Sequence, residues 1–573
     1  MRWVLAVLGA ERLRLALAVF LLCCAAGALA GQSAAVRGTG GAVASAAPAA
    51  TEVGLEILEA GGNAADAAVA TALALAVVRP EAGNLGGGGF AVTRFDDQVR
   101  ALDFRETAPA AASRDMYLDA RGKPRRRASL VGPLATGVPG SPAGLHELHR
   151  ALGDLPWQAV VAPAAQLARE GFVVDDRLAK SVRQRQSLLR RFPETAAVWL
   201  PDGRPPAAGS GMRLPALART LAAYAEEGPS AITEGEVAAA IGRSVAQHGG
   251  VLSAKDLADY RALWRDPVRF AAFGWELASM PLPSSGGIIL GQTFGLLERL
   301  DWAERPRSGT QRAHLLAESW RRAFADRYLL GDPRTSKASA VELLADPWLD
   351  RRAAQIDRTK ATPSDRVAPW SPEAARESTQ TTHLSVLDGA GNAVAMTTTL
   401  NGSFGCGLLV PRAGFLLNNE MDDFAAAPGH ANLYGLVQGE ANAVGPGKRM
   451  LSSMSPTIAW RGEQTVVLGS PGGSTIPTVT AQVLLNLIVD RDPLAEAVAR
   501  PRIHHQWMPD RIVAEPDAVS PELAESLKAR GHRLRRFDSL GEVLAVTGDG
   551  ESVQASSDPR HAGAAGVVEA AKN

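Results

Sequence analysis

Polar and apolar positions follow a strand-like pattern along two neighbouring segments in the second half of the chain, and the first of these alternates. The segments are residues 381–387 and 393–400, both rich in β-branched side chains, and the glycine-containing stretch 388–392 separates them. Strand-like runs joined by a short glycine-rich turn are typical of a β-hairpin. We therefore predict two antiparallel strands here.

The register of this hairpin would bring hydroxyl groups together. If the residues that flank the turn face each other, Thr381 lies opposite Thr399, and Ser385 and Thr397 share their face. An ordinary solvated strand would give such a row of hydroxyls, and so would a reactive site.

The sequence around the hairpin favours the reactive site. Upstream, Ala361 to Gln380 contains several prolines and charges and no apolar period, which predicts an exposed, mobile connector. Downstream, clusters of glycine and polar residues interrupt the apolar runs. They lie at 401–405, 416–424, 451–456 and 469–474. Sites on the rim of a sheet draw their groups from such clusters.

Helical periodicity dominates the rest of the chain. Apolar residues recur at helical spacing from Glu52 to Val78 around a break at Gly61-Gly62-Asn63, which predicts two helices. Strands are predicted at Phe90–Phe95 and Val99–Phe104. The clearest further helices are Ala143–Leu152, Ala216–Ala223, Gln311–Tyr328, Ile476–Val489 and Pro521–Ala529. The pattern indicates an α+β protein whose helices cover a sheet.

Composition narrows the class of protein. The 573 residues include 60 basic and 60 acidic side chains. This balance argues against a nucleic acid or an anionic membrane surface as partner. Because 46% of the residues are apolar and only 21% are charged, we expect a large packed core rather than disorder.

The N-terminus resembles a targeting signal. Arg12 and Arg14 precede an apolar run at 15–24, and Ala28-Leu29-Ala30 follows. This order predicts a signal peptide over residues 1–30 and an exported protein, periplasmic or secreted from a bacterium. An uncleaved membrane anchor is the alternative. Residues 31–50, rich in Ala, Gly and Ser, are expected to form a flexible leader.

Cysteine is scarce after the predicted signal. Only Cys406 remains, so an internal disulfide is excluded. Its surroundings, Gly405 to Gly407, look like part of a strand, and we interpret Cys406 as a small buried hydrophobe rather than a nucleophile.

Three motifs resemble known functional sites but do not meet the requirements of those sites. The Gly86–Gly89 run lacks the Lys-Ser/Thr of a phosphate-binding loop. His504 and His505 are adjacent, so on a strand they point to opposite faces and make a poor zinc site. Ser470 does not stand in a Gly-x-Ser-x-Gly elbow.

Short motifs follow one another in a fixed order along most of the chain. They lie at 61–68, 86–90, 103–106, 137–140, 283–287, 381–386, 397–405, 416–424, 446–458 and 469–474. The series resembles the γ-glutamyltransferase family of N-terminal-nucleophile hydrolases, from about Gly40 to the end.

The resemblance implies a fold and a maturation step. It implies a four-layer αββα sandwich built jointly by a large subunit, residues 51–380, and a small subunit, residues 381–573. The two subunits would arise by self-cleavage at Gln380–Thr381 and stay together as a heterodimer.

The predicted nucleophile is Thr381. A threonine hydroxyl is a weak nucleophile and needs a base. The α-amino group of an N-terminal residue, which titrates at about 7.7–8.0, can supply it. An internal Thr381 lacks that amine, so cleavage is required. By resemblance, Thr399 orients the hydroxyl, and the N–H groups at Gly472 and Gly473 stabilise the oxyanion.

A γ-glutamyl group carries an α-carboxylate and an α-ammonium, which need opposite partners. The resemblance implies that Arg105 binds the carboxylate with help from Ser452 and Ser453. It assigns Glu420 and Asp423 as acceptors for the ammonium.

Two further residues complete the predicted site. Asn401 would bridge to the same glutamyl group, and Tyr434 would belong to a lid over it, formed by Pro428 to Gly439. The alternative for the acidic cluster around Asp422 is a surface turn or a cation site. We expect no metal, because no histidine supports that cluster.

These inferences predict a γ-glutamyltransferase and glutathione hydrolase. It would pass the γ-glutamyl group of glutathione to water, an amino acid or a peptide, with no cofactor. One alternative is a related acylase of glutaryl or β-lactam side chains. Another is an uncleaved, inactive exported protein that only binds its ligand.

Overall fold

The structure is a computed structural model that describes residues 35–125, 127–368, 381–425 and 438–570. The expected signal peptide, the last residues before Thr381, and Tyr434 with most of the expected lid lie outside the described residues. Among the helices that are described, none has both the length and the apolarity of a membrane span.

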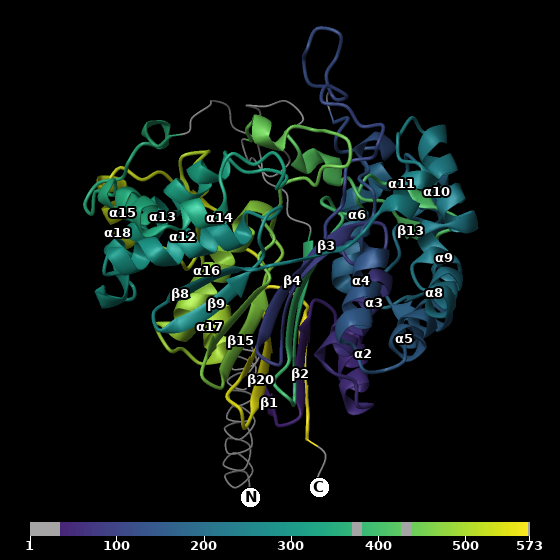
Figure 1. The fold of residues 1–573 in the computed structure, drawn as a ribbon, viewed down its shortest axis with the longest axis horizontal. Helices are drawn as coiled ribbons and strands as arrows, with labels where there is room; N and C mark the ends of the chain where they lie inside the picture. The colour runs from purple at the N-terminus through teal and green to yellow at the C-terminus, as the bar shows by residue number, and fades with distance from the viewer. Residues whose placement is uncertain (1–34, 126, 369–380, 426–437, 571–573) are drawn as a thin grey trace, which may run out of the picture.

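Two antiparallel sheets lie face to face in the middle of the molecule (Figure 1). Within the described residues each has seven strands. The first runs in the order β21 (Ala564–Val568), β2 (Gly41–Ser45), β10 (Thr381–Asp388), β11 (Ala393–Thr399), β3 (Gly88–Phe95), β4 (Gln98–Phe104) and β7 (Leu263–Arg265). The second runs β1 (Val36–Gly38), β20 (Val553–Ser557), β19 (Leu544–Gly548), β15 (Gln464–Gly469), β14 (Thr457–Arg461), β9 (Trp275–Ser279) and β8 (Val268–Ala272).

A layer of helices covers the outer face of each sheet (Figure 1). The first layer comprises α2 (Pro48–Glu59), α3 (Ala64–Val78), α4 (Ser141–Leu152), α5 (Trp157–Glu170), α8 (Pro215–Glu227) and α10 (Gly235–Gln247). The second comprises α12 (Gly286–Arg299), α13 (Thr310–Arg327), α15 (Asp346–Ala354), α16 (Ile476–Ile488) and α18 (Pro521–Ala529). The predicted four-layer αββα sandwich is confirmed, as are the predicted helices, to within a few residues at their ends.

Local sequence explains the first helical pair. The Asn63 side chain accepts hydrogen bonds from the backbone N–H groups of Ala65 and Asp66, and Asp66 accepts one from the Asn63 N–H, which makes a capping box. The helix α3 that follows consists almost entirely of small apolar residues and is buried on all sides. Such a helix can pack closely on β10 and β11, which it contacts.

The predicted hairpin forms in the predicted register. Thr381 pairs with Thr399 across β10 and β11. The hydroxyl row beside them is buried between the two sheets, so the interpretation as a solvated strand face is wrong. The His383 ring lies between two of these hydroxyls, with Nδ1 2.8 Å from Thr397 Oγ1 and Nε2 3.0 Å from Ser385 Oγ.

The expected flexible leader is wrong for residues 36–50. Val36–Gly38 and Gly41–Ser45 form strands, and α2 begins at Pro48. The second of these strands, β2, lies inside the first sheet between β21 and β10. Its small side chains suit a strand enclosed between α2 and the second sheet. The same small side chains gave no alternation of polar and apolar positions, which is the signal by which strands are predicted.

Two smaller expectations also need correction. The first part of the connector is anchored: the Ala361 N–H donates to Arg530 O at 2.7 Å, and the Ser364 N–H donates to Asp510 Oδ2 at 2.9 Å. Cys406 is buried as expected but lies in a turn rather than a strand.

Candidate active site

A small pocket lies at the end of the hairpin where β10 begins and β11 ends. It is lined by Arg105, Arg327, Thr381, Thr399, Glu420, Asp423, Ser452, Ser453, Met454, Gly473 and Ile476. The remaining cavity measures about 20 Å³, close to the space that one water molecule needs. The polar groups predicted from distant parts of the sequence therefore meet, and they are packed against one another.

Thr399 is held at the end of its strand by its neighbours. Its Oγ1 accepts a hydrogen bond from the Asn401 N–H at 2.7 Å, and its carbonyl oxygen accepts one from Asn84 Nδ2 at 2.8 Å. A Cβ on Gly87 would lie 2.1 Å from that same oxygen, so this position of the glycine run admits no side chain. The run that lacks a phosphate-loop signature thus lets the backbone of β3 approach the site.

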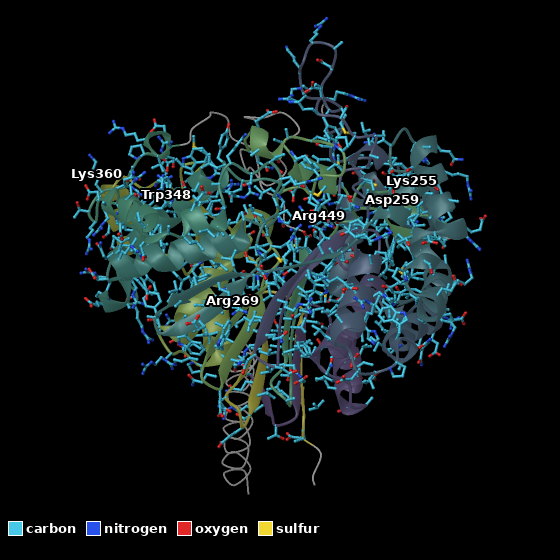
Figure 2. The ribbon with its side chains drawn as sticks, viewed as in Figure 1. Lys255, Asp259, Arg269, Trp348, Lys360 and Arg449 are labelled. Carbon is cyan, nitrogen blue, oxygen red and sulfur yellow. The ribbon has the colours of Figure 1, made fainter. Side chains whose placement is uncertain are left out.

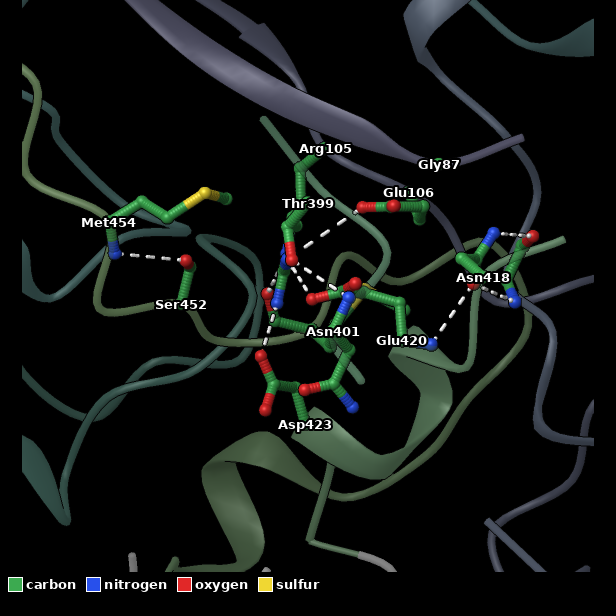
Figure 3. A network of polar contacts seen from close by, with 12 residues as sticks. Gly87, Arg105, Glu106, Thr399, Asn401, Asn418, Glu420, Asp423, Ser452 and Met454 are labelled. Carbon is green, nitrogen blue, oxygen red and sulfur yellow. Dashed lines mark hydrogen bonds and ion pairs between the residues drawn. The ribbon is translucent and has the colours of Figure 1, made fainter. Parts of the chain in front are cut away.

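Arg105 follows β4 and is fully buried. Its Nε donates to Met450 O at 3.3 Å, its NH1 forms an ion pair with Glu420, and its NH2 lies 2.6 Å from Asp423 Oδ2. Figure 3 shows these three side chains together with Thr399. The predicted carboxylate-binding group and the predicted ammonium acceptors therefore pair with each other. A ligand that brings both a carboxylate and an ammonium can replace each partner with one of its own.

Burial sets the protonation of this pocket. It raises the pKa of Glu420, against the opposing effect of Arg105. It also raises the pKa of Glu106, whose carboxylate lies 3.7 Å from Arg105, to about 7. Burial alone would lower the pKa of Arg105, but Glu420, Asp423 and Glu106 together raise it. The guanidinium is therefore charged at any physiological pH.

A second buried network fixes the backbone from which Arg105 projects. Arg449 NH1 lies 2.7 Å from Asp103 Oδ1 and donates to Arg105 O at 2.9 Å. Tyr260 OH donates to the same carbonyl oxygen at 2.7 Å. Figure 2 shows Arg449 near the middle of the molecule, whereas Lys360 lies at its edge. These contacts limit the movement of Arg105 to its side chain.

Ser452 and Ser453 form the opposite wall. The Ser452 N–H donates to Pro283 O at 2.8 Å, and Ser452 Oγ accepts from the Met454 N–H at 3.1 Å (Figure 3). Ser453 Oγ is buried and has no hydrogen-bond partner among the described residues. A buried hydroxyl without a partner is costly, so this oxygen is suited to a ligand.

The glycine pair lies at the start of a helix. Gly472 and Gly473 have positive φ angles of 139° and 57°, and the turn that follows leads directly into α16. Gly473 lines the pocket. A Cβ on Gly472 would lie 2.4 Å from Thr475 Oγ1. Both positions therefore favour glycine, Gly472 because a side chain would clash there and Gly473 because its φ angle strains a residue with a Cβ, and the expected oxyanion role stays a prediction.

The remaining predicted residues lie close by or outside the described residues. Asn401 follows Thr399 and donates from Nδ2 to Asn419 O at 2.9 Å. Asp422, the centre of the alternative cation site, accepts a hydrogen bond from Ser129 Oγ at 2.6 Å. Tyr434 lies outside the described residues. Sequence reasoning missed Arg327 altogether, because it stands in the periodic pattern of α13 like any other charged residue.

Comparison with known proteins assigns the chain to a protein family. The family model of Gamma-glutamyltranspeptidase matches residues 50–568. The chain is 44% identical to the glutathione hydrolase proenzyme of Pseudomonas aeruginosa, over 92% of this chain and 95% of that protein. It is also 44% identical to the glutathione hydrolase proenzyme of Escherichia coli K12, over 92% and 91% of the two chains. Among solved structures, the cephalosporin acylase from Bacillus halodurans is similar with a TM-score of 0.82 at 26% identity, over 95% of this chain and 98% of that one.

Proposed function

Because the chain belongs to the gamma-glutamyltranspeptidase family, we propose that it is a γ-glutamyltransferase and glutathione hydrolase. The observation that carries this proposal is the pocket itself. Two hairpin threonines face a buried arginine that is paired with two carboxylates. These charged groups match the zwitterionic end of a γ-glutamyl amide, whereas an uncharged acyl group would offer them no partner.

Maturation precedes activity in this proposal. The Thr381 hydroxyl attacks the carbonyl carbon of Gln380, the C–N bond breaks, and the freed nitrogen becomes the α-amine of Thr381. Water then hydrolyses the ester. The products are a large subunit that ends at Gln380 and a small subunit of residues 381–573. The heterodimer would persist, because the segments on both sides of Thr381 contribute strands to each sheet.

Turnover then uses the new amine as base. It takes the proton of the Thr381 hydroxyl, which attacks the γ-carbonyl of glutathione and expels cysteinylglycine. Thr399 orients the hydroxyl, and the N–H groups at Gly472 and Gly473 stabilise the oxyanion. The ester passes to water or to an amino acid or peptide. No step needs a cofactor.

Substrate binding uses the charges already in the pocket. Arg105, Ser452 and Ser453 take the α-carboxylate, while Glu420 and Asp423 take the ammonium. Asn401 assists, and Tyr434 closes the site as part of a lid. The signal peptide predicted over residues 1–30 would direct the enzyme out of the cytoplasm, to the periplasm or the medium.

The second candidate is an acylase, which the similarity to a cephalosporin acylase structure supports. The higher identity to glutathione hydrolase proenzymes and the charged pocket favour the first. Comparing hydrolysis of γ-glutamyl and glutaryl anilides separates the two, since a clear preference for the glutaryl compound requires the acylase. An intact chain that binds ligand without turnover would indicate a binding protein.

The deciding experiment replaces Thr381. Wild-type protein should purify as two fragments, the smaller beginning at Thr381, and should hydrolyse γ-glutamyl-4-nitroanilide. Thr381→Ala should stay one chain without turnover, and Thr381→Ser should be cleaved and retain partial activity. Thr382→Ala is the matched control, because its hydroxyl points to the other face of the strand. Cleavage and turnover by Thr381→Ala would refute the proposal.

A further inference from the structure

Arg327, the last residue of α13, lines the same pocket as Thr381 and has no role in the reaction proposed above. Its side chain is buried, at 3% exposure. Its Nε donates to Ser285 Oγ at 3.0 Å. Among the described residues no carboxylate lies within ion-pair distance of it.

This lack of a carboxylate partner sets Arg327 apart from the other buried arginines in the described part of the chain. Each of the others has a carboxylate oxygen within 4.0 Å, namely Arg79, Arg105, Arg312, Arg321, Arg322, Arg352, Arg449 and Arg502. A buried charge is costly unless it is paired. A lone buried guanidinium on a pocket wall is therefore suited to an anion from outside the chain.

The charge of Arg327 survives burial. Burial lowers its pKa to about 10, with Asp423 opposing the shift and Arg105 adding to it. The group is thus a cation at neutral pH. Its terminal nitrogens donate to none of the described residues, yet they are not sealed inside the protein, so they remain available at the pocket.

Hydrogen bonds place this cation beside the serine pair. Ser285 Oγ, which accepts from Arg327, donates in turn to Ser452 O at 2.7 Å, and the Ser285 N–H donates to the same oxygen at 2.9 Å. The next residue, Ser453, has the buried hydroxyl without a partner among the described residues. An anion at this wall would meet a guanidinium and a free hydroxyl together.

We infer that Arg327 is a second carboxylate-binding residue of the pocket, which pairs with a carboxylate of the substrate. The inference rests on the proposed function. Arg327 would supply a positive charge that Arg105 does not have free, because the Arg105 guanidinium is already shared between Glu420 and Asp423. The position beside Ser452 and Ser453 favours the α-carboxylate of the γ-glutamyl group. The glycine carboxylate of glutathione offers the same chemistry from the leaving group.

The test compares substrates with and without each carboxylate. Wild type, Arg327→Gln and Arg327→Lys are assayed with γ-glutamyl-4-nitroanilide, with 4-aminobutyryl-4-nitroanilide, which lacks the α-carboxylate, and with glutathione. Arg334→Gln, which removes an exposed arginine of the next loop, is the control for loss of one charge. Binding of L-glutamate and of 4-aminobutyrate is measured by calorimetry on the same proteins.

Arg327→Gln should raise KM for the γ-glutamyl anilide roughly 10- to 100-fold, the usual range for loss of a charged hydrogen-bonding partner. It should leave the 4-aminobutyryl anilide unaffected. For Arg327→Lys, the KM for the γ-glutamyl anilide should lie between those of the wild type and Arg327→Gln. This variant keeps the charge, so it separates the effect of charge from that of shape if Arg327→Gln folds poorly. A loss confined to glutathione assigns the partner to the glycine carboxylate. Equal losses on all three substrates, or none, would overturn the inference.

The binding measurement separates this inference from the proposed function. If the wild type turns over no γ-glutamyl compound, the proposed function fails. The ratio of glutamate to 4-aminobutyrate affinity then still decides about Arg327. A ratio that falls in Arg327→Gln supports it, and a ratio that stays the same rejects it.

Discussion

At the scale of single residues, we propose that the pocket binds its ligand by exchange of ionic partners. Arg105, Glu420 and Asp423 satisfy one another in a space too small for a substrate. Removing one partner of a buried ion pair is strongly destabilising, so a ligand has to supply both charges at once. This requirement would select zwitterionic groups over simple acids or amines.

Asp423 offers a direct test of this exchange. Asp423→Asn keeps the shape but removes the charge that would meet the substrate ammonium. We expect KM for γ-glutamyl donors to rise roughly 10- to 100-fold, with chain cleavage preserved. Steady-state kinetics and gel analysis measure both. Asp422→Asn is the control, since that carboxylate accepts from Ser129 instead. A similar rise in KM for both variants would contradict the assignment.

His383 predicts a pH dependence of stability. Ser385 Oγ donates to Leu544 O at 2.9 Å, so it accepts from His383 Nε2, and Nδ1 accepts from Thr397. Burial lowers the His383 pKa from 6.5 to about 3. Between these values the unfolded state binds a proton that the folded state does not. The stability from this group is therefore complete above pH 6.5 and is lost as the pH falls toward 3.

The effect can be isolated by substitution. The shift corresponds to roughly 5 kcal/mol at most. His383→Gln should be less stable at pH 7, but its unfolding temperature should fall less steeply between pH 6.5 and 3. Differential scanning calorimetry across this range measures the slope. His561→Gln, at an exposed position, should keep the wild-type slope. Parallel slopes for wild type and His383→Gln would exclude the mechanism.

At the scale of elements, two glycines with the same backbone angle separate strain from function. Gly473 in the pocket and Gly462 in the turn between β14 and β15 both have φ of 57°. Alanine at either position should cost about 1 kcal/mol of stability. Only Gly473→Ala should also lose most turnover, because it alone lines the pocket. Thermal unfolding and anilide hydrolysis of the two variants, measured side by side, decide the point.

The elements also show what sequence can reveal. The hairpin was predictable because a short turn fixes its register, and the register alone placed Thr381 opposite Thr399. The strand β2 was not predictable. It consists of Gly, Ala, Val and Ser, which show no alternation of polar and apolar side chains. Arg327 was not predictable either. Its significance is that no carboxylate among the described residues pairs with it, and this depends on tertiary packing rather than on its place in the sequence.

At the scale of the whole molecule, the two halves of the chain are interleaved. In the first sheet β10 and β11 lie between β2 and β3, and β2 is bonded on its other side to β21 near the C-terminus. Each segment covers the strand edges of its neighbours. Neither half could keep its backbone hydrogen bonds alone, so cleavage before Thr381 should leave one cooperative body.

This interleaving makes the start of the chain essential. A protein that begins at residue 35 keeps β1 and β2 and should fold, cleave itself and turn over γ-glutamyl-4-nitroanilide. A protein that begins at residue 51 loses both strands, which exposes the edge of β10 that carries Thr381. It should be insoluble or remain one uncleaved chain. Expression of both, followed by gel filtration and mass measurement, tests this. Efficient cleavage of the shorter protein would mean that β2 is dispensable for assembling the nucleophile.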